Sequence, residues 1–217
     1  MKKFKKIIAM GCAAVMTVSA MSMSAFAAED NTPLMVKGQE IETEFALSNF
    51  EEPITQINNS GSEVISYITI DGVEVPYEYK LSEETANLSA DIMPLAETVY
   101  ETENNNSIDY ANRIYDDNNV YGAISYVGDE DWYVISFNNV GAVNFWLGSI
   151  PTGCDYDIYL YEQNGNYAKL VEKSINDGNA DELISSYTCL GKTNYFIRIV
   201  GNGTHSNAMY LFRARMQ

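Results

Sequence analysis

Short runs of alternating apolar and polar residues fill the second half of the chain. Turn signals such as Asn164-Gly165 and Gly201-Asn202-Gly203 separate these runs. Short strands with a turn signal about every 8–12 residues are typical of antiparallel β-sandwiches and jelly rolls, and not of βαβ folds. We therefore expect an all-β antiparallel sandwich of about eight strands, preceded by a short helix at 108–114. The predicted strands are 120–126, 132–138, 142–147, 157–161, 169–173, 183–188, 195–200 and 209–214.

A β-hairpin is predicted upstream of the sandwich, at residues 63–81. Two β-rich runs flank Asp71-Gly72 there, and this dipeptide is among the strongest short-range hairpin signals. Pro76 restricts the second run to an edge strand or to a strand end. A lone hairpin is only marginally stable, so it must pack on another part of the protein or pair with a partner. Residues 82–96 read as a short helix or a linker, interrupted by Pro94.

The first 27 residues have the layout of a secretory signal peptide. A basic start, MKKFKK, precedes an apolar stretch at 7–18, and Ala25-Phe26-Ala27 has the small-x-small pattern of a cleavage site. A lipoprotein would use Cys12 instead, but the apolar run continues beyond that residue. No later stretch approaches the ~20 apolar residues of a membrane span. We expect a secreted, extracellular protein with a signal peptide at 1–27, a lead-in region at 28–99 and the sandwich at 100–217.

The chain is strongly acidic, with 13 Lys and Arg against 30 Asp and Glu and a net charge of −17. Loss of the four lysines in the signal peptide would make it more acidic still. Such a surface repels nucleic acid and anionic membranes, so neither is expected as a stable partner. Two cysteines, Cys154 and Cys189, remain after cleavage. Export permits a disulfide between them, but a chain of this length can bury a core without one, and both states stay open.

Most catalytic patterns are absent from the sequence. The single histidine, His205, follows a glycine-rich turn, and no serine lies in a G-x-S-x-G elbow. No H-E-x-x-H motif is present, and Leu190-Gly191-Lys192-Thr193 lacks the first glycine of a phosphate-binding loop. The acidic runs that begin at Asp155 and Asp177 lack the glycine and the final glutamate of an EF-hand. The sequence therefore predicts no enzyme.

Six oxygen-bearing side chains form the candidate metal site. In an extended segment every second side chain lies on the same side, so Glu101, Glu103 and Asn105 would face one way. Calcium takes 6–8 oxygen ligands in loose geometry, which such a segment can supply together with an acidic turn. The opposing interpretation is an ordinary solvated linker and turn. The candidate ligands are Glu101, Glu103, Asn105, Asn106, Asp129 and Asp131.

Four motifs in order carry a family resemblance: ETENNNSIDYAN, YGAISYVGDEDWYVISF, DYDIYLYEQNG, and NYFIRIV followed by MYLFRAR. The stretch from about residue 101 to 215 resembles the bacterial pre-peptidase C-terminal domain, a secreted β-sandwich appended to extracellular peptidases. The collagen-binding domains of clostridial collagenases are related to it. The resemblance implies calcium ligands at the same six positions. Asn104 replaces a usual proline and Asn106 a frequent aspartate, so weaker calcium binding is expected.

Asp155 and Asp157 fall where that family has aspartates before its central strand. We expect them to shape the turn by accepting bonds from nearby backbone N–H groups. A catalytic carboxylate pair is the alternative interpretation, although the sequence shows no substrate-binding cleft beside them.

Because the chain contains no peptidase, we expect a secreted, non-catalytic binding module, stabilised by calcium. Its ligand would be an extracellular protein or polysaccharide on a tyrosine-rich face. The alternative is a chaperone-like or inhibitory partner of a separately encoded secreted peptidase, since the edge at 73–79 could add to another sheet. A small hydrolase that uses Asp155, Asp157 and His205 is a third hypothesis.

Overall fold

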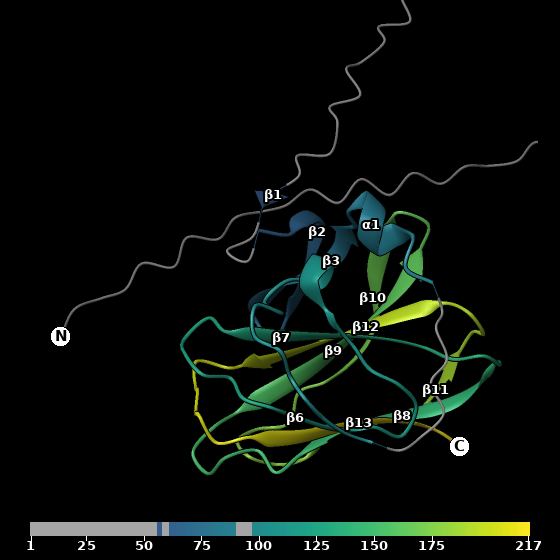
Figure 1. Ribbon diagram of the computed structural model, residues 1–217. Helices are drawn as coiled ribbons and strands as arrows, with labels where there is room; N and C mark the ends of the chain where they lie inside the picture. Colours follow the sequence, from purple (N-terminus) through teal and green to yellow (C-terminus); the bar gives the residue numbers. More distant parts are fainter. Residues whose placement is uncertain (1–55, 58–60, 90–96) are drawn as a thin grey trace, which may run out of the picture. The chain divides into compact units, whose positions relative to one another are not determined.

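The computed structural model describes residues 56–57, 61–89 and 97–217 (Figure 1). The predicted signal peptide and most of the region before residue 61 lie outside the described residues. All described residues belong to one contact unit, Asn49–Gln217. None of the helices in this part of the chain is long and apolar enough to cross a membrane.

Eight strands close to the predicted positions form the body of the fold. Strand β6 ends earlier than predicted, at Gly122, because the side chain of Glu101 accepts the next backbone N–H, that of Ala123, at 2.7 Å. The strands are β6 (Asn119–Gly122), β7 (Glu130–Ser136), β8 (Gly141–Gly148), β9 (Tyr156–Asn164), β10 (Tyr167–Ser174), β11 (Glu182–Cys189), β12 (Asn194–Gly201) and β13 (Tyr210–Met216).

These strands form two sheets with jelly-roll connectivity. Sheet A contains the order β10-β9-β12-β7, and sheet B contains β11-β8-β13-β6. If β6 is counted as strand 1 and β13 as strand 8, the two orders become 5-4-7-2 and 6-3-8-1. This is the pattern of a double Greek key. The predicted all-β sandwich is therefore confirmed. Its main core lies between the sheets, where Phe145 and Leu147 of β8 pack with Leu160 of β9 and Ile197 of β12.

The predicted hairpin is present as β2 (Glu63–Ile70) and β3 (Val73–Lys80). Asp71 and Gly72 both have positive φ, 48° and 85°, as a tight two-residue hairpin turn requires. Strand β1 (Gln56–Ile57) pairs with β2. On the other side, the end of β3 pairs with β10, for example Tyr79 with Ala168. The hairpin thus extends sheet A beyond β10.

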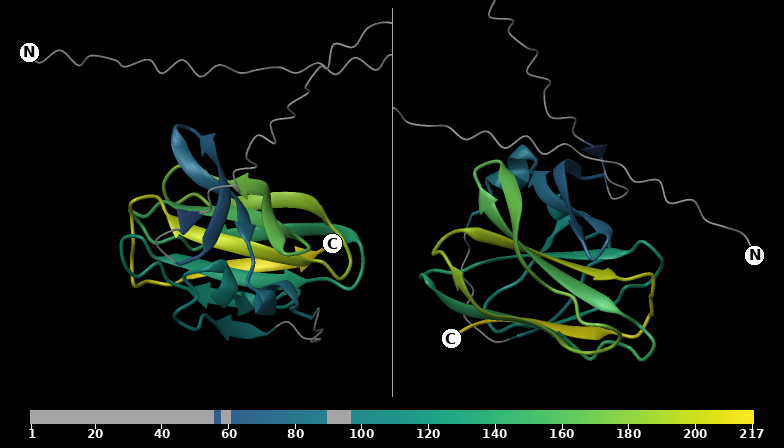
Figure 2. Two further views of the ribbon diagram at one scale, coloured as in Figure 1. Left: turned by 90° about the horizontal axis from the view of Figure 1, so that it is seen from above. Right: turned by 180° about the vertical axis from the view of Figure 1, so that it is seen from behind.

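The hairpin also folds over the outer face of sheet A, where it forms a third layer above β7, β9 and β12 (Figures 1 and 2). A second hydrophobic core lies beneath it. The ring of Tyr79 meets those of Trp132 and Tyr161 at centroid distances of 5.2 and 5.3 Å. The hydroxyl of Tyr161 donates to the carbonyl of Pro76 at 2.9 Å. The strands β7, β9 and β12 are consequently buried on both faces.

The remaining elements are short. Helix α1 (Glu83–Ala86) begins after Ser82, whose side chain accepts the N–H of Thr85 at 3.2 Å. The helix predicted at 108–114 is wrong beyond Tyr110: a 3-10 turn, η1 (Ile108–Tyr110), is followed by β5 (Asn112–Arg113), which pairs in parallel with β7. Strand β4 (Thr98–Tyr100) pairs in parallel with β6, so sheet B runs across the boundary predicted at residues 99 and 100.

Cys154 and Cys189 are both free and buried in the main core. Burial raises the pKa of Cys189 to about 12, so its thiol stays protonated and inert at neutral pH.

Candidate functional site

Glu101 directly follows β4 and bonds to the neighbouring strand through its backbone and its side chain. Its N–H donates to the carbonyl of Tyr121 at 2.9 Å. One carboxylate oxygen, Oε1, accepts the N–H of Ala123 at 2.7 Å. The carboxylate is therefore fixed at the end of β6, partly buried, where the two sheets approach each other.

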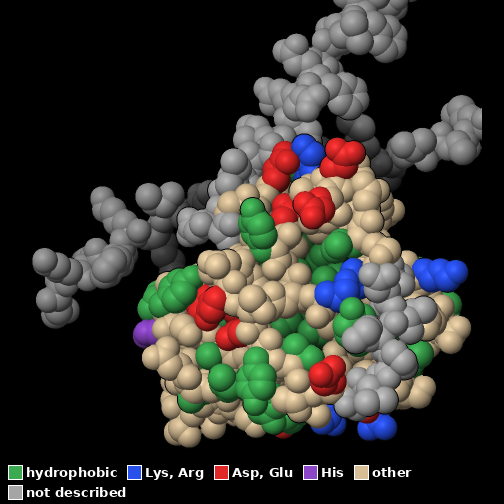
Figure 3. All heavy atoms as spheres, in the orientation of Figure 1, with side chains coloured by type: hydrophobic (Ala, Val, Ile, Leu, Met, Phe, Trp, Pro, Cys, Tyr) green, Lys and Arg blue, Asp and Glu red, His purple; other side chains and the backbone are tan. Residues whose placement is uncertain are grey.

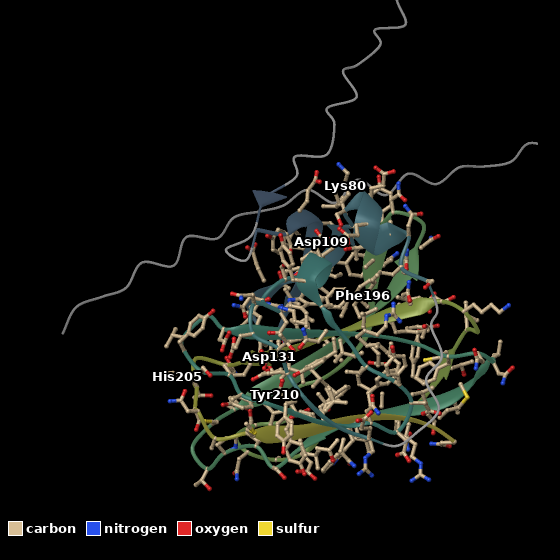
Figure 4. All side chains as sticks on the ribbon, viewed as in Figure 1. Lys80, Asp109, Asp131, Phe196, His205 and Tyr210 are labelled. Atoms are coloured by element: carbon tan, nitrogen blue, oxygen red, sulfur yellow. The ribbon has the colours of Figure 1, made fainter. Side chains whose placement is uncertain are left out.

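Asp131 meets this carboxylate from the opposite sheet. It is 1% exposed, and its Oδ2 accepts the hydroxyl of Tyr210 at 2.6 Å. The hydroxyls of Tyr210 and Tyr133 lie 2.8 Å apart, and Tyr133 donates to Oε2 of Glu101 at 3.3 Å. Figure 4 shows Asp131 and Tyr210 side by side inside the sandwich. These four side chains, Glu101, Asp131, Tyr133 and Tyr210, are called the carboxyl–tyrosine cluster below.

The two carboxyl groups of the cluster influence each other's ionisation. Burial, reinforced by the charge of Glu101, raises the pKa of Asp131 to about 9, and burial also raises the pKa of Glu101. Two adjacent buried carboxyl groups cannot both carry a full charge unless a cation lies between them. At neutral pH the pair therefore holds either a proton or a cation.

Gly122 makes room for the cluster. A Cβ atom there would lie 2.6 Å from Oε2 of Glu101 and 2.6 Å from the hydroxyl of Tyr133. Real Cβ contacts are never this short, and none of the polar atoms can withdraw without losing its hydrogen bond. The cluster therefore depends on glycine at this position.

Asn105 lies fully buried in the segment that follows Glu101. It is 0% exposed, and neither Oδ1 nor Nδ2 has a hydrogen-bond partner. Its backbone carbonyl accepts the N–H of Trp132 at 3.0 Å, which places Asn105 against the residue that follows Asp131. A buried amide without a partner costs about 1–3 kcal/mol, so this side chain is the strongest sign of a ligand at the site.

Asn106 and Asp129 use their polar atoms within the protein. The Asn106 amide donates to Oδ1 of Asp129 at 2.8 Å and to the carbonyl of Glu130 at 2.8 Å, and it accepts the hydroxyl of Tyr126 at 2.7 Å. The second oxygen of Asp129 accepts the N–H of Ser125 at 2.6 Å. These bonds hold the 125–130 turn against the 101–107 segment, and they leave neither side chain free for a metal.

Glu103 stays in solvent, because Asn104 has a positive φ of 77° that breaks the expected extended segment. Its charge still raises the pKa of Glu101, so it lies within electrostatic reach. Of the six predicted ligands, the structure brings Glu101 and Asp131 together. Asn105 is buried without a side-chain hydrogen bond, Asn106 and Asp129 bond to each other, and Glu103 is exposed to solvent. Sequence reasoning missed Tyr133, Tyr210 and Gly122, for which no local motif exists.

The donor set fits calcium in part. Glu101, Asn105 and Asp131 offer only hard oxygen atoms and include two carboxylates, as calcium prefers. Among residues 61–89 and 97–217, no group of three or more His, Cys, Asp or Glu side chains is placed to hold a metal ion. Any ion here would therefore depend on Asn105 and backbone or water oxygens besides the carboxyl pair.

Asp155 and Asp157 line a cavity of about 310 Å³ between the tip of the hairpin and the ends of β9 and β12. The sequence alone made no cleft evident at this position. Their carboxylates accept from side chains, not from backbone N–H groups: Asn202 Nδ2 at 3.1 Å and the Tyr159 hydroxyl at 3.3 Å. Burial raises the pKa of Asp157 to about 6.

The candidate bases or nucleophiles in this cavity are carboxylates, among them Asp155 and Asp157. Its guanidinium, Arg198, is held by Glu130 through two bonds of 2.6 and 2.9 Å. The described residues that line it include no histidine, cysteine or serine. His205 is exposed on the loop between β12 and β13 (Figure 4).

Comparison with known proteins gives weak likenesses to solved structures and none in sequence. No family model matches the chain, and no curated protein matches it. A solved structure that resembles it is the pre-peptidase C-terminal domain of a collagenase from Bacillus anthracis, with a TM-score of 0.34 and 14% identity over 48% of this chain and 94% of that one. A likeness of this size does not assign the chain to that family.

Proposed function

We propose that this protein is a secreted, non-catalytic binding module that is stabilised by calcium and engages an extracellular protein or polysaccharide. The observation that carries the calcium proposal is Asn105. Its side chain is fully buried with both polar atoms unbonded, and its backbone bonds to the residue that follows Asp131. The carboxyl pair of Glu101 and Asp131 needs a proton or a cation. A bound cation would satisfy Oδ1 of Asn105 and neutralise the carboxyl pair at once.

Glu101, Asn105 and Asp131 would hold the ion, with Glu103 adding long-range charge. Calcium supplies positive charge here and no chemistry. These three ligands would then connect the 101–106 segment to β7. The Asp131–Tyr210 hydrogen bond of 2.6 Å would extend the connection to β13. Calcium would thereby stabilise the closed end of the sandwich, where both sheets meet.

Two observations support a role other than catalysis. Two carboxyl groups with raised pKa values, Glu101 and Asp131, face inward and are covered by Tyr133 and Tyr210. The thiol of Cys189 is buried and protonated. An enzyme needs a nucleophile or a base that can reach its substrate, and neither of these sets is placed to do so.

Thermal unfolding of the full secreted chain in calcium and in chelator tests the calcium proposal. A ligand that binds only the folded state adds about 2.7 kcal/mol at a hundredfold excess over its Kd, so we expect the midpoint to rise by several degrees with millimolar calcium. Magnesium should raise it less, because magnesium demands a tighter geometry. An unchanged midpoint in calcium would contradict the proposal.

Two variants test whether the calcium response depends on Asp131 and Asn105. Asp131→Asn should abolish the calcium response. Asn105→Leu removes the orphaned amide, so it should raise the midpoint in chelator and also abolish the response. Asp177→Asn, which removes a carboxylate from an exposed loop, is the matched control and should keep the full response. A calcium response that survives in both site variants would place the ion elsewhere.

The alternative, a partner of a separately encoded peptidase, rested on a free strand edge at 73–79. In the structure β3 pairs with β2 along its length and with β10 at Glu78–Lys80, so this edge is partly used within the chain. Retention of an endogenous secreted peptidase, and of no matrix polymer, on the immobilised protein would favour the alternative. Amino-terminal sequencing of protein from culture supernatant tests the predicted cleavage after Ala27.

A further inference from the structure

The outer face of sheet B differs in charge from the rest of this acidic protein. Alternate residues of β4, β6, β8 and β13 point away from the main core, as their alternating burial shows. None of these outward residues is Asp or Glu, in a chain with 30 of them. They are Thr98, Tyr100, Asn119, Tyr121, Ala142, Asn144, Trp146, Leu211, Arg213 and Arg215.

Figure 3 shows sheet B from its edge: acidic side chains gather over the hairpin and α1 at the top, with a few in the middle and lower parts of the view, and basic side chains reach the surface along the lower edge. The nearest carboxylates in the loops beside this face, Asp117 and Asp181, are bound to Arg215 and Trp146. The face is thus close to neutral.

Trp146 lies flat on this face. A Cβ atom on Gly148 would lie 2.6 Å and 2.8 Å from two carbons of the indole ring, so one side of the ring rests on the backbone at Gly148. The indole N–H donates to Oδ2 of Asp181 at 3.0 Å, which fixes the plane of the ring. Trp146 is partly exposed, and it offers a rigid, flat aromatic surface parallel to the sheet.

A row of apolar side chains crosses the face to meet this ring. Tyr100 pairs with Tyr121, Tyr121 with Leu211, and Leu211 with Gly148, which the indole covers. The rings of Tyr100 and Tyr121 are stacked at 5.7 Å, and Tyr100 is 61% exposed. Strands lie ~4.8 Å apart, so the row from β4 to β8 spans about 14 Å.

Polar groups flank the row on one side. Arg213 donates to Oδ1 of Asn119 and lies 3.9 Å from Asp117, and Arg215 lies 3.7 Å from the same carboxylate. These contacts hold the guanidinium groups along the sheet surface. Arg215 remains 65% exposed, and most of its five N–H donors are free to bond a ligand's hydroxyl oxygens.

We propose that this face binds a chain of uncharged sugars. The inference rests on the proposed binding function and names its ligand class. A flat ring presents a surface that matches the C–H face of a sugar ring, and the adjacent Arg and Asn side chains match its hydroxyls. An anionic polymer would be repelled by the net charge of −17. Protein hot spots centre on well-packed pockets, and the four strands that carry this face do not line the cavities at the hairpin tip, at β10 and β11, or at α1.

Binding to insoluble cellulose, chitin and starch tests the proposal, with polygalacturonate and collagen as comparison polymers. The full chain should bind at least one of the uncharged polymers, with little change between low and high salt because no charge pair forms. Trp146→Ala and Tyr100→Ala should each weaken binding about tenfold, as loss of one ring contact predicts. Arg215→Gln should weaken it about threefold.

Exposed residues elsewhere provide matched controls. Tyr110→Ala removes a tyrosine that is 71% exposed on η1, and Lys192→Gln removes an exposed cation on the β11–β12 loop. Both should bind as the parent does. Tyr100 and Arg215 lie on the surface, so their variants keep the test valid even if Trp146→Ala fails to fold. The second tryptophan, Trp132, is fully buried in the other core, so fluorescence changes on binding report Trp146.

The possible results distinguish failure of the sugar-binding face from failure of the proposed binding function. Binding to collagen or polygalacturonate alone would overturn the sugar ligand and leave a binding module. Binding to an uncharged polymer that tolerates all three face variants would overturn this face. Binding to none of the five polymers would contradict both the inference and the proposed function.

Discussion

The ring of Tyr79 on the hairpin meets the indole of Trp132 on β7 edge to face, with centroids 5.2 Å apart and planes at 88°. Both side chains are 0% exposed. This contact joins the amino-terminal hairpin to the jelly roll, and aromatic pairs of this kind add about 0.5–1.5 kcal/mol beyond the area they bury.

Replacing Tyr79 should therefore destabilise the whole described unit. We expect Tyr79→Ala to cost about 3–5 kcal/mol, the range for deleting a large buried aromatic side chain. Urea unfolding followed by tryptophan fluorescence measures the change. Tyr67→Ala, on β2 of the same hairpin and 37% exposed, is the control and should cost under about 1 kcal/mol. Equal costs for the two variants would show that the second core contributes little.

Gly122→Ala should disrupt the carboxyl–tyrosine cluster. The new methyl group would collide with Glu101 and Tyr133 at 2.6 Å, so we expect a loss of about 2–4 kcal/mol and a weaker calcium response. Gly141→Ala is the matched control, since its nearest neighbour is the flexible end of Met216 at 3.1 Å. Circular dichroism melts in calcium and in chelator measure both effects. A variant with parental stability at Gly122 would contradict the geometry.

Stability should fall as pH rises from about 4 to 7 in the absence of calcium. The pKa of Asp157 is raised to about 6, from 3.8 in a model compound. Burial is the main cause, and the charges of Asp155 and Glu182 add to it. The folded state then binds more protons than the unfolded state between these values, so stability is full below the unfolded pKa and is lost as pH passes 6. The raised pKa of Glu182 acts in the same direction.

Asp157→Asn tests this pH dependence. The variant should be more stable than the parent at pH 7, by on the order of 1 kcal/mol after allowance for solvent screening, and should equal it near pH 4. Asp177→Asn, on an exposed loop, should leave the profile unchanged. A parent protein whose thermal midpoint is flat or rises over this range would contradict the prediction.

The Arg198–Glu130 and Lys80–Glu63 ion pairs should differ sharply in the stability lost when each is removed. Arg198 and Glu130 form a two-bond pair in which the side chains are 13% and 17% exposed. Glu130→Ala leaves the guanidinium buried without its partner and should cost about 3–5 kcal/mol. Glu63→Ala removes an exposed pair with Lys80 and should cost under about 1 kcal/mol. Chemical denaturation of both variants makes the comparison.

The alternation of side chains was enough to predict the strands and the hairpin. It could also have predicted the third layer. Strands β7, β9 and β12 read WYVI, IYLY and YFI, runs without polar alternation, and such runs indicate strands covered on both faces. The helix predicted at 108–114 fails because pairing of Asn112–Arg113 with β7 outweighs local preference.

The candidate site was predicted less completely. Glu101 and Asp131 are brought together as the sequence suggested, but Asn106 and Asp129 bond each other, which spacing alone cannot show. Tyr133 and Tyr210 join the site through register across two sheets. Long-range contacts of this kind leave no local signature in one sequence.

The bond between Asp131 and Tyr210 spans 79 positions of the chain, and this has a consequence for the order of synthesis. Tyr210 lies on β13, the last strand of the sandwich in chain order, whereas Glu101 precedes β6, the first strand of the jelly roll. The growing chain therefore exposes the acidic half of the cluster long before the strand that covers it exists. Until β13 pairs with its neighbours, Asp131 lacks the hydroxyl that covers it, so the cluster closes only in the last step of sandwich assembly.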